Sequence, residues 1–279
     1  MIPLCVLVLT LTGAAVAQAD VRLVEQIVNP GFGPDKVGAR TTTNRVFLKE
    51  RRQKVETTIE TTERTARALR EQGQSLREST ILRLDRDEVI EIDLDAATYS
   101  QAKVPAAKAV TAPAAPRSGA PQIGFQVRET GDTTRVAGIP CRRVVAQMRA
   151  RYLDPKTKKP QRENRYTYDA WIARDFPGSR ELTAFRDLQR SRTSYPPLIS
   201  GGLEQLRGIV EDYDSLASEM SALEGYALRS TMRVTVVRAG QTQEAEVFRL
   251  EREVKELVYS ALPDSVFEVP RALTRVSDR

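Results

Sequence analysis

The residue types that usually carry covalent or metal chemistry are scarce in this chain. Histidine is absent from all 279 residues, which removes the usual general base for Ser, Cys or Thr nucleophiles and the commonest zinc ligand. Cysteine occurs twice, at Cys5 and Cys141, which is too few for a metal site built from thiolates. The sequence therefore predicts no metal centre and no cofactor.

Two local patterns are compatible with chemistry, but each lacks its necessary companions. The segment Asp85–Asp95 contains four aspartates that could bind calcium, yet it misses the D-x-D-x-D-G loop and its closing Glu, so we interpret them as solvated turn acids. Ser100 and Lys103 have the Ser-x-x-Lys spacing of penicillin-binding enzymes, whose S-D-N and K-T-G elements are missing from the sequence. No catalytic residue is predicted. An acid-dependent hydrolase, with two carboxylates about 5–9.5 Å apart in a cleft, stays open as an alternative.

The first nineteen residues predict where the rest of the chain works. An uncharged apolar run from Ile2 to Val16 is followed by Ala-Gln-Ala at 17–19, the small-residue cleavage signature of an export signal. About fifteen apolar residues fall short of the roughly 20 needed to span a bilayer, so we expect cleavage and a periplasmic or secreted mature protein that begins at Asp20. Cys141 is then the one remaining thiol, and its apolar neighbours predict a buried side chain.

The mature chain divides at one segment of unusual composition. Residues 102–121 consist mainly of Ala, Pro, Lys and Val without periodicity, which predicts a flexible linker or loop. This segment separates residues 20–101, an N-terminal part of the sheet, from residues 122–270, a C-terminal part with helices, and residues 271–279 form a tail. Positive charges are interspersed with 37 acidic residues, unlike the face of a nucleic-acid binder, so no nucleic-acid partner is expected.

Period-two alternation of apolar and polar residues predicts a mostly antiparallel sheet. Before the linker we expect a strand over Val21–Asn29, a hairpin of Thr41–Lys49 with Arg51–Thr58, and a second hairpin of Ile81–Asp85 with Val89–Asp93. After the linker the predicted strands are Ile123–Glu129, Thr133–Ala137, Arg142–Leu153, Arg162–Ala173, Tyr226–Val237 and Thr242–Tyr259, the last with a bulge between Val247 and Phe248.

Three segments are expected to be helical. The clearest is Leu203–Glu224, whose apolar residues recur at alternating steps of three and four, so that a wide apolar face must be buried against the sheet. A shorter helix, capped by Ser179, places Leu182, Phe185 and Leu188 on one side. The segment Glu60–Glu78 is predicted to be a helix, with an extended loop as the alternative.

Four short motifs resemble a family of exported bacterial domains of unknown function. They are the hairpin from Ile81 through Asp93 to Tyr99, the G-x-x-C strand entry Val136–Cys141, the W-I-A-x-D segment within Ala170–Asp175, and the closing D-S-x-F-x-V-P within Pro263–Pro270. That family is similar in architecture to LolA-type periplasmic lipoprotein carriers. The resemblance implies an α+β fold with a curved, mostly antiparallel sheet, a half-barrel with helices on its concave face that can hold an acyl chain. The linker and Glu60–Glu78 look like insertions.

Two non-enzymatic functions follow as hypotheses. The first is a periplasmic protein that binds a lipid, an acyl chain, an acylated protein or another apolar ligand between sheet and helix, although the same residues could form a dry core. The second is an envelope-associated scaffold with a protein partner and no small ligand. The first hypothesis predicts a lining of Val144, Met148, Tyr166, Tyr168, Leu228, Met232 and Val234, with Leu206, Tyr213 and Met220 as the lid.

Overall fold

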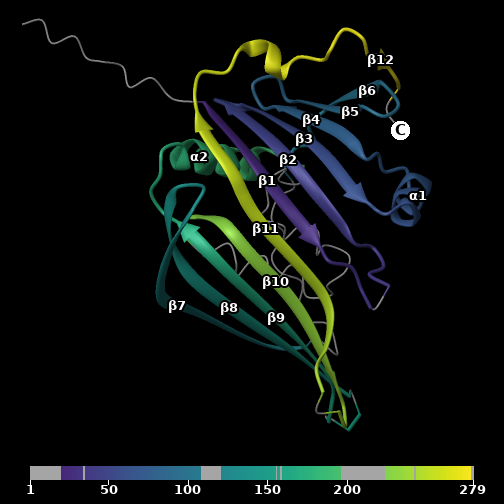
Figure 1. The fold of residues 1–279 in the computed structure, drawn as a ribbon, viewed down its shortest axis with the longest axis vertical. Coiled ribbons are helices and arrows are strands. Elements are labelled where there is room, and N and C mark those ends of the chain that lie inside the picture. Colours follow the sequence, from purple (N-terminus) through teal and green to yellow (C-terminus); the bar gives the residue numbers. More distant parts are fainter. Residues whose placement is uncertain are drawn as a thin grey trace, which may run out of the picture.

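The computed structural model describes residues 20–33, 35–107, 121–154, 156–157, 159–195, 224–241 and 243–277. The predicted export signal, most of the predicted linker and all of the predicted helix Leu203–Glu224 except Glu224 itself lie outside these ranges. Within them the chain is mostly sheet, and twelve strands form one large, open sheet (Figure 1). None of the described helices is long and apolar enough to cross a membrane.

The first half of the chain contributes six strands and one helix to this fold. In chain order they are β1 (Val21–Asn29), β2 (Arg40–Lys49), β3 (Arg52–Thr61), α1 (Glu63–Glu71), β4 (Arg77–Arg83), β5 (Glu88–Asp93) and β6 (Thr98–Lys103). The second half contributes β7 (Gln122–Val136), β8 (Ile139–Leu153), β9 (Pro160–Ala173), α2 (Ser179–Arg192), β10 (Tyr226–Arg238), β11 (Ala245–Tyr259), the 3-10 turn η2 (Asp264–Phe267) and β12 (Thr274–Arg275).

The two halves of the chain belong to one sheet. The strand order is β12-β6-β5-β4-β3-β2-β1-β11-β10-β9-β8-β7, so the antiparallel pair of β1 with β11 joins the halves at the centre of the sheet. All neighbouring strands are antiparallel except β12 and β6, which are parallel. The large antiparallel sheet predicted from the sequence is therefore present, and both of its outer edges are formed by described strands.

Local sequence explains most element boundaries. The apolar phase slip in β11 is a bulge: Val234 pairs with Phe248 and Thr235 with Glu246, which leaves Val247 unpaired as predicted. The two strands predicted on either side of residue 131 are one strand, β7, with an irregular register between Glu129 and Thr133. The linker is predicted to begin at residue 102, but β6 continues to Lys103, so the first two residues of the predicted linker belong to the sheet.

The structure differs from the predicted helices in two places. Helix α1 is shorter than the expected Glu60–Glu78, because Arg77 and Glu78 pair with β3 as the start of β4. Helix α2 begins at Ser179, but its N-cap is Gly178 at φ 80°, without a side-chain cap. Ser179 is thus the first helical residue, and the prediction that it caps the helix is wrong.

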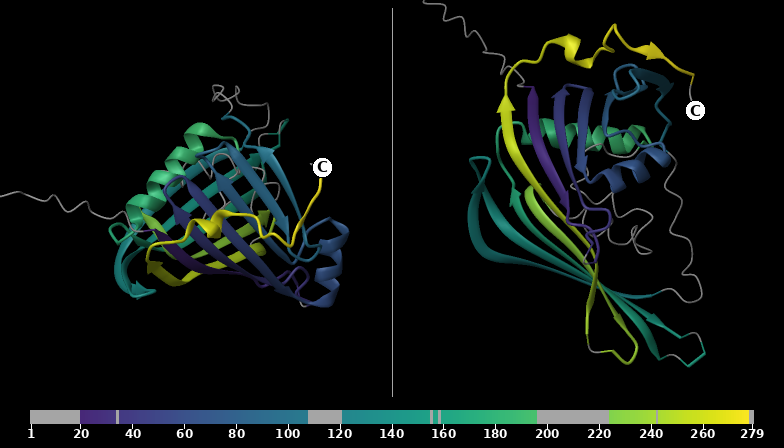
Figure 2. Two further views of the ribbon diagram at one scale, coloured as in Figure 1. Left: turned by 90° about the horizontal axis from the view of Figure 1, so that it is seen from above. Right: turned by 45° about the vertical axis from the view of Figure 1, so that its right-hand side comes forward.

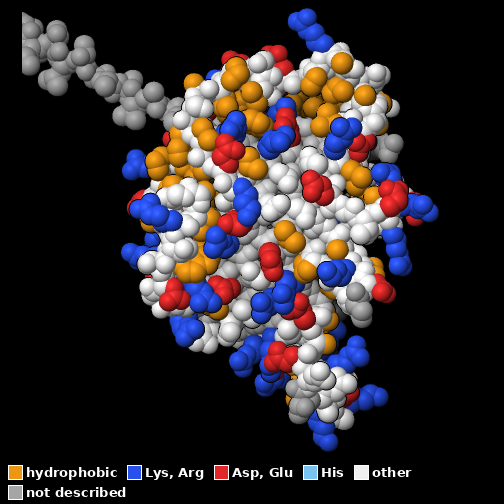
Figure 3. Space-filling model, viewed as in Figure 1, with side chains coloured by type: hydrophobic (Ala, Val, Ile, Leu, Met, Phe, Trp, Pro, Cys, Tyr) orange, Lys and Arg blue, Asp and Glu red, His pale blue; other side chains and the backbone are white. Residues whose placement is uncertain are grey.

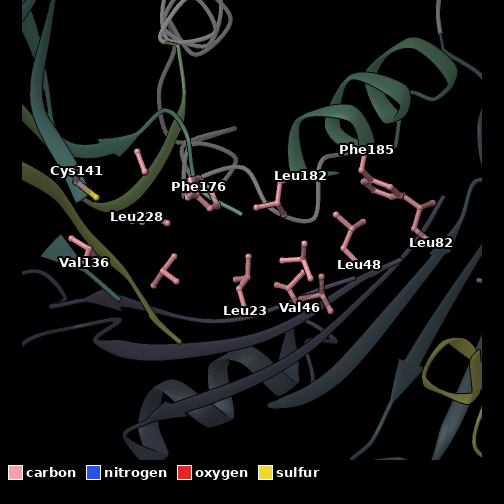
Figure 4. Packing of buried hydrophobic residues seen from close by; sticks show 14 of the residues in the cluster. Leu23, Val46, Leu48, Leu82, Val136, Cys141, Phe176, Leu182, Phe185 and Leu228 are labelled. Carbon is pink, nitrogen blue, oxygen red and sulfur yellow. The ribbon is translucent and has the colours of Figure 1, made fainter. Parts of the chain in front are cut away.

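Helix α2 packs against one face of the sheet. Its buried Leu182 and Phe185 share a hydrophobic cluster with Leu23 of β1 and Leu48 of β2 (Figure 4). Cys141 lies in the same cluster with 2% of its surface exposed, so its predicted burial is confirmed. This packing fixes α2 beside the first half of the sheet, as two further views show (Figure 2).

A smaller cluster lies on the opposite face of β4 and β5. It contains Ile81, Ile90 and Ile92 from these strands together with Leu262 and Phe267. Ile81 alternates with Leu82, which belongs to the α2 cluster, so β4 is buried on both faces. The segment that follows β11 therefore covers the outer face of the first half of the sheet.

Candidate ligand-binding face

The structure places most of the predicted lining on one sheet face in the second half of the chain. Met148, Tyr166 and Val234 form one row across β8, β9 and β10, because Met148 pairs with Tyr166 and Tyr166 with Val234. The next row contains Tyr168 and Met232, also direct partners. Each of these side chains is at most 6% exposed.

We call this set of buried residues the apolar face. It is a single hydrophobic cluster whose members all lie on strands β1 and β8 to β11: Ile27, Val144, Ala146, Met148, Ala150, Tyr166, Tyr168, Ala170, Ile172, Met232, Val234, Phe248 and Leu250. Six of the seven predicted lining residues belong to it. The seventh, Leu228, is fully buried in the neighbouring cluster beside α2. The predicted lid residues Leu206, Tyr213 and Met220 lie outside the described residues.

Sequence reasoning missed part of this face, although the signal was present. Ala146 and Ala150 alternate with Val144 and Met148 along β8, so the same period-two pattern that predicted the larger residues also includes the small ones. Phe248 and Leu250 follow the bulge in β11, where the change of phase reverses the face that each residue occupies.

A buried ion pair between β1 and β11 bounds the apolar face at the end nearer helix α2. Arg252 of β11 contacts Glu25 of β1 with Nη2 and Nε at 2.6 and 2.7 Å from Oε2, and both side chains are at most 3% exposed. Asn44 Nδ2 donates to the other Glu25 oxygen at 2.9 Å. Glu25 lies between Leu23 and Ile27 on the inward phase of β1. The charges therefore separate the apolar face from the cluster beneath α2.

The surroundings of Arg252 favour the charged form of its guanidinium. Burial by itself would lower the pKa of Arg252, but the nearby Glu25 carboxylate raises it, and the net direction is upward. Burial raises the pKa of Tyr226 to about 12, so its hydroxyl is neutral and accepts a hydrogen bond from Arg252 Nη2 at 3.1 Å. The ion pair thus links β1 and β11 through buried side chains.

A recess lies on the first half of the sheet, away from the apolar face. A cavity of about 750 Å³ runs along β4, β5 and β6, with Glu78, Glu91 and Asp93 among its lining residues. The Tyr195 hydroxyl donates to Glu91 Oε1 at 3.0 Å. Desolvation raises the pKa of Glu78, and the charges of Glu91 and Asp93 add to this shift. Glu78 and Glu91 are exposed, as in a solvated acidic groove, and we assign no catalytic role to them.

The aspartates that resembled calcium ligands serve local turns. Asp95 accepts from the Leu76 backbone N–H at 2.9 Å and pairs with Arg77 at 2.8 Å. Asp85 pairs with Arg83 at 2.8 Å. Among the described residues no group of three or more His, Cys, Asp or Glu is arranged to hold a metal ion. The interpretation of these residues as turn acids agrees with their contacts.

The Ser-x-x-Lys pattern does not form a functional pair. Ser100 and Lys103 lie in the extended strand β6, where residues three positions apart point to opposite faces. A nucleophile and its base must be within hydrogen-bonding reach of each other, so this spacing carries chemistry on a helix and not on this strand. The pattern is a coincidence of sequence.

Comparison with known proteins adds no family assignment. No protein-family model matches the chain, and no curated protein sequence matches it. The resemblance to exported bacterial domains and to LolA-type carriers therefore stays a prediction from the sequence motifs. What the structure itself supplies is a large open antiparallel sheet with a buried apolar face bounded by an ion pair.

Proposed function

We propose that the protein is an exported, non-enzymatic binding protein that holds an acyl chain or a similar apolar ligand against the apolar face. The predicted export signal places this activity in the periplasm or outside the cell. The proposal extends the resemblance to LolA-type carriers, in which helices on the concave face of a curved sheet enclose the ligand. Its main support is that the apolar face is one continuous set of apolar side chains on neighbouring strands of the sheet.

The dimensions of the face suit an acyl chain. From Val144 to Ala150 along β8, six steps of a strand extend roughly 20 Å at about 3.4 Å per residue. The Arg252–Glu25 pair bounds the upper end of this stretch, because an apolar chain cannot replace the hydrogen bonds of a buried charge. An apolar ligand would therefore lie parallel to the strands, between the ion pair and the ends of the β8–β9 and β10–β11 hairpins.

Burial of methylene groups sets the upper limit of the affinity. Each buried methylene contributes about 0.8 kcal/mol, so ten methylenes contribute about 8 kcal/mol before the entropy of association is subtracted. Without that subtraction the value would correspond to a dissociation constant of about 1 μM, which is therefore the tightest binding that ten methylenes can provide. Affinity should therefore depend on chain length more than on any single polar contact.

Two measurements on the same preparation test this proposal. Protein purified from the cell envelope without detergent should release lipid on organic extraction, and the delipidated protein should bind an acyl fluorophore and change its emission. Loss of both signals would overturn the proposal. Recovery of one stoichiometric protein partner with no extracted lipid would favour the envelope scaffold instead.

A further inference from the structure

We infer that a second copy of this chain pairs with strand β7, so that the sheets of two protomers join edge to edge through antiparallel β7 strands. This inference goes beyond the proposed function and does not depend on it. Among the described strands, β7 has a neighbour on one side only, because it ends the strand order. It forms the outer edge of the second half of the sheet (Figure 1). A strand in this position presents backbone N–H and C=O groups with which another strand can pair.

The sequence of β7 lacks the features that usually protect such an edge. Exposed edges are commonly blunted by Lys, by Pro or by a very short strand, whereas β7 has 15 residues and contains neither Lys nor Pro. Residues 122–127 carry no charge, and most of the strand is exposed. Figure 3 shows hydrophobic side chains at the surface on the side where β7 lies in Figure 1. The composition of β7 is therefore that of a strand that pairs on both sides.

Three apolar residues of β7, Ile123, Phe125 and Val127, extend the apolar face to this edge. Their direct partners on β8 are the apolar-face residues Ala150, Met148 and Ala146. Directly opposed residues of an antiparallel pair lie on the same face of a sheet. Phe125 packs against the apolar face, whereas Ile123 is 43% and Val127 41% exposed. A neighbouring strand with apolar residues at the same positions would cover these two side chains.

The apolar residues of β7 are complementary to themselves in one register. A two-fold axis through Phe125, perpendicular to the sheet, places Phe125 opposite Phe125 of the second copy and Ile123 opposite Val127. All three apolar side chains of each copy then meet apolar side chains of the other. Moving the axis to Gln126 would instead place Ile123 opposite Glu129. The sequence therefore favours the axis at Phe125.

The polar residues of β7 fit the same register. Gln122 lies opposite Arg128 of the second copy and Gly124 opposite Gln126, so no two like charges are directly opposed. The register with β8 becomes irregular after Glu129, which limits regular pairing to residues 122–128 of each copy. This symmetry closes after two copies. Both apolar faces then lie on the same side of the joined sheet and form one continuous surface.

Sedimentation velocity over a range of protein concentrations tests the inference. Because the contact uses one short stretch of strand, we expect a concentration-dependent dimer, with a weight-average mass that rises toward twice the monomer value by about 200 μM. Val127→Lys places a charge in the apolar part of the contact and should keep the protein monomeric at that concentration. Circular dichroism of this variant should match that of the unaltered protein, since the substituted side chain is exposed.

The matched control is Val247→Lys. Val247 is also 41% exposed, but it lies on β11 in the interior of the strand order, so this variant should dimerise like the unaltered protein. A monomer mass at every concentration up to about 200 μM overturns the inference. A dimer that persists in Val127→Lys, or one that Val247→Lys abolishes to the same extent, also overturns it.

Cysteine cross-linking tests the register independently. Directly opposed Cα atoms of antiparallel strands lie about 4.5–5.5 Å apart, a spacing that a disulfide can span. On oxidation, a mixture of Ile123→Cys and Val127→Cys should form a covalent dimer with one copy of each variant, and neither variant should cross-link alone. Native Cys141 is present in both variants and is 2% exposed, so it does not account for a difference. Cross-linking of either variant with itself, or none in the mixture, overturns the axis at Phe125.

Discussion

At the residue scale, two charged residues stand at strand positions where the alternation of β1 and β11 otherwise places apolar side chains. Glu25 follows Val21 and Leu23 on the inward phase of β1, and Arg252 lies between Leu250 and Val254 on the inward phase of β11. The period-two pattern already marks both as exceptions. A buried charge must be paired, and the structure pairs these two side chains across strands that are distant in the sequence.

Loss of the buried carboxylate should destabilise the protein severely. Glu25→Gln leaves the Arg252 guanidinium buried without a counter-charge, which should lower the free energy of unfolding by about 3–5 kcal/mol. The matched control is Glu256→Gln, because the Arg22–Glu256 pair joins the same two strands with side chains 42% and 47% exposed. That control should change stability by less than about 1 kcal/mol. Equal denaturation midpoints for the two variants would contradict the assigned role.

The acidic groove should give a pH dependence of the opposite sign to an ordinary salt bridge. The pKa of Glu78 is raised in the folded state by desolvation and by Glu91 and Asp93, so the charged form is disfavoured on folding. This penalty is absent below the unfolded pKa and develops as pH rises through the folded pKa. Glu78→Gln should therefore raise the midpoint of urea unfolding at pH 7 and leave it unchanged near pH 4. An equal gain at both pH values would contradict this account.

At the element scale, short-range patterns predicted strands better than helices. The bounds of β1 follow directly from alternation, and the bulge at Val247 follows from a phase slip in β11. The helix predicted over Glu60–Glu78 is longer than α1. Arg77 and Glu78 show no strand alternation, yet they belong to β4 because they pair with β3. The short β12 has no sequence signal of its own, since its two residues pair with β6 only through the tertiary fold.

Helix α2 should be essential for the stability of the first half of the sheet. Phe185 is 3% exposed and packs in the cluster that contains Leu48 and Leu82, so Phe185→Ala should lower the free energy of unfolding by about 3–5 kcal/mol. Thr183→Ala, at an exposed position of the same helix, should have an effect within about 0.5 kcal/mol. Denaturant titration of both variants checks the comparison, and a Phe185 effect no larger than that of Thr183 would show that α2 is not held by this cluster.

At the scale of the whole molecule, the sequence predicts the class of fold and much of the apolar face, but not the joining of the two halves. Alternation places Val144, Met148, Tyr166 and Tyr168 on one face of their strands. It does not reveal that β1 pairs with β11, because such long-range pairing depends on the register of all the intervening strands.

The central claim is that an apolar chain lies against the apolar face, and methionine methyl groups can report it directly. Met148 and Met232 are both on this face, at 1% and 4% exposure. In protein labelled with ¹³C-methyl methionine, we expect a spin-labelled fatty acid to broaden both signals saturably, with recovery after the label is reduced. Unchanged line widths of both methyl signals at saturating fatty acid would contradict the account.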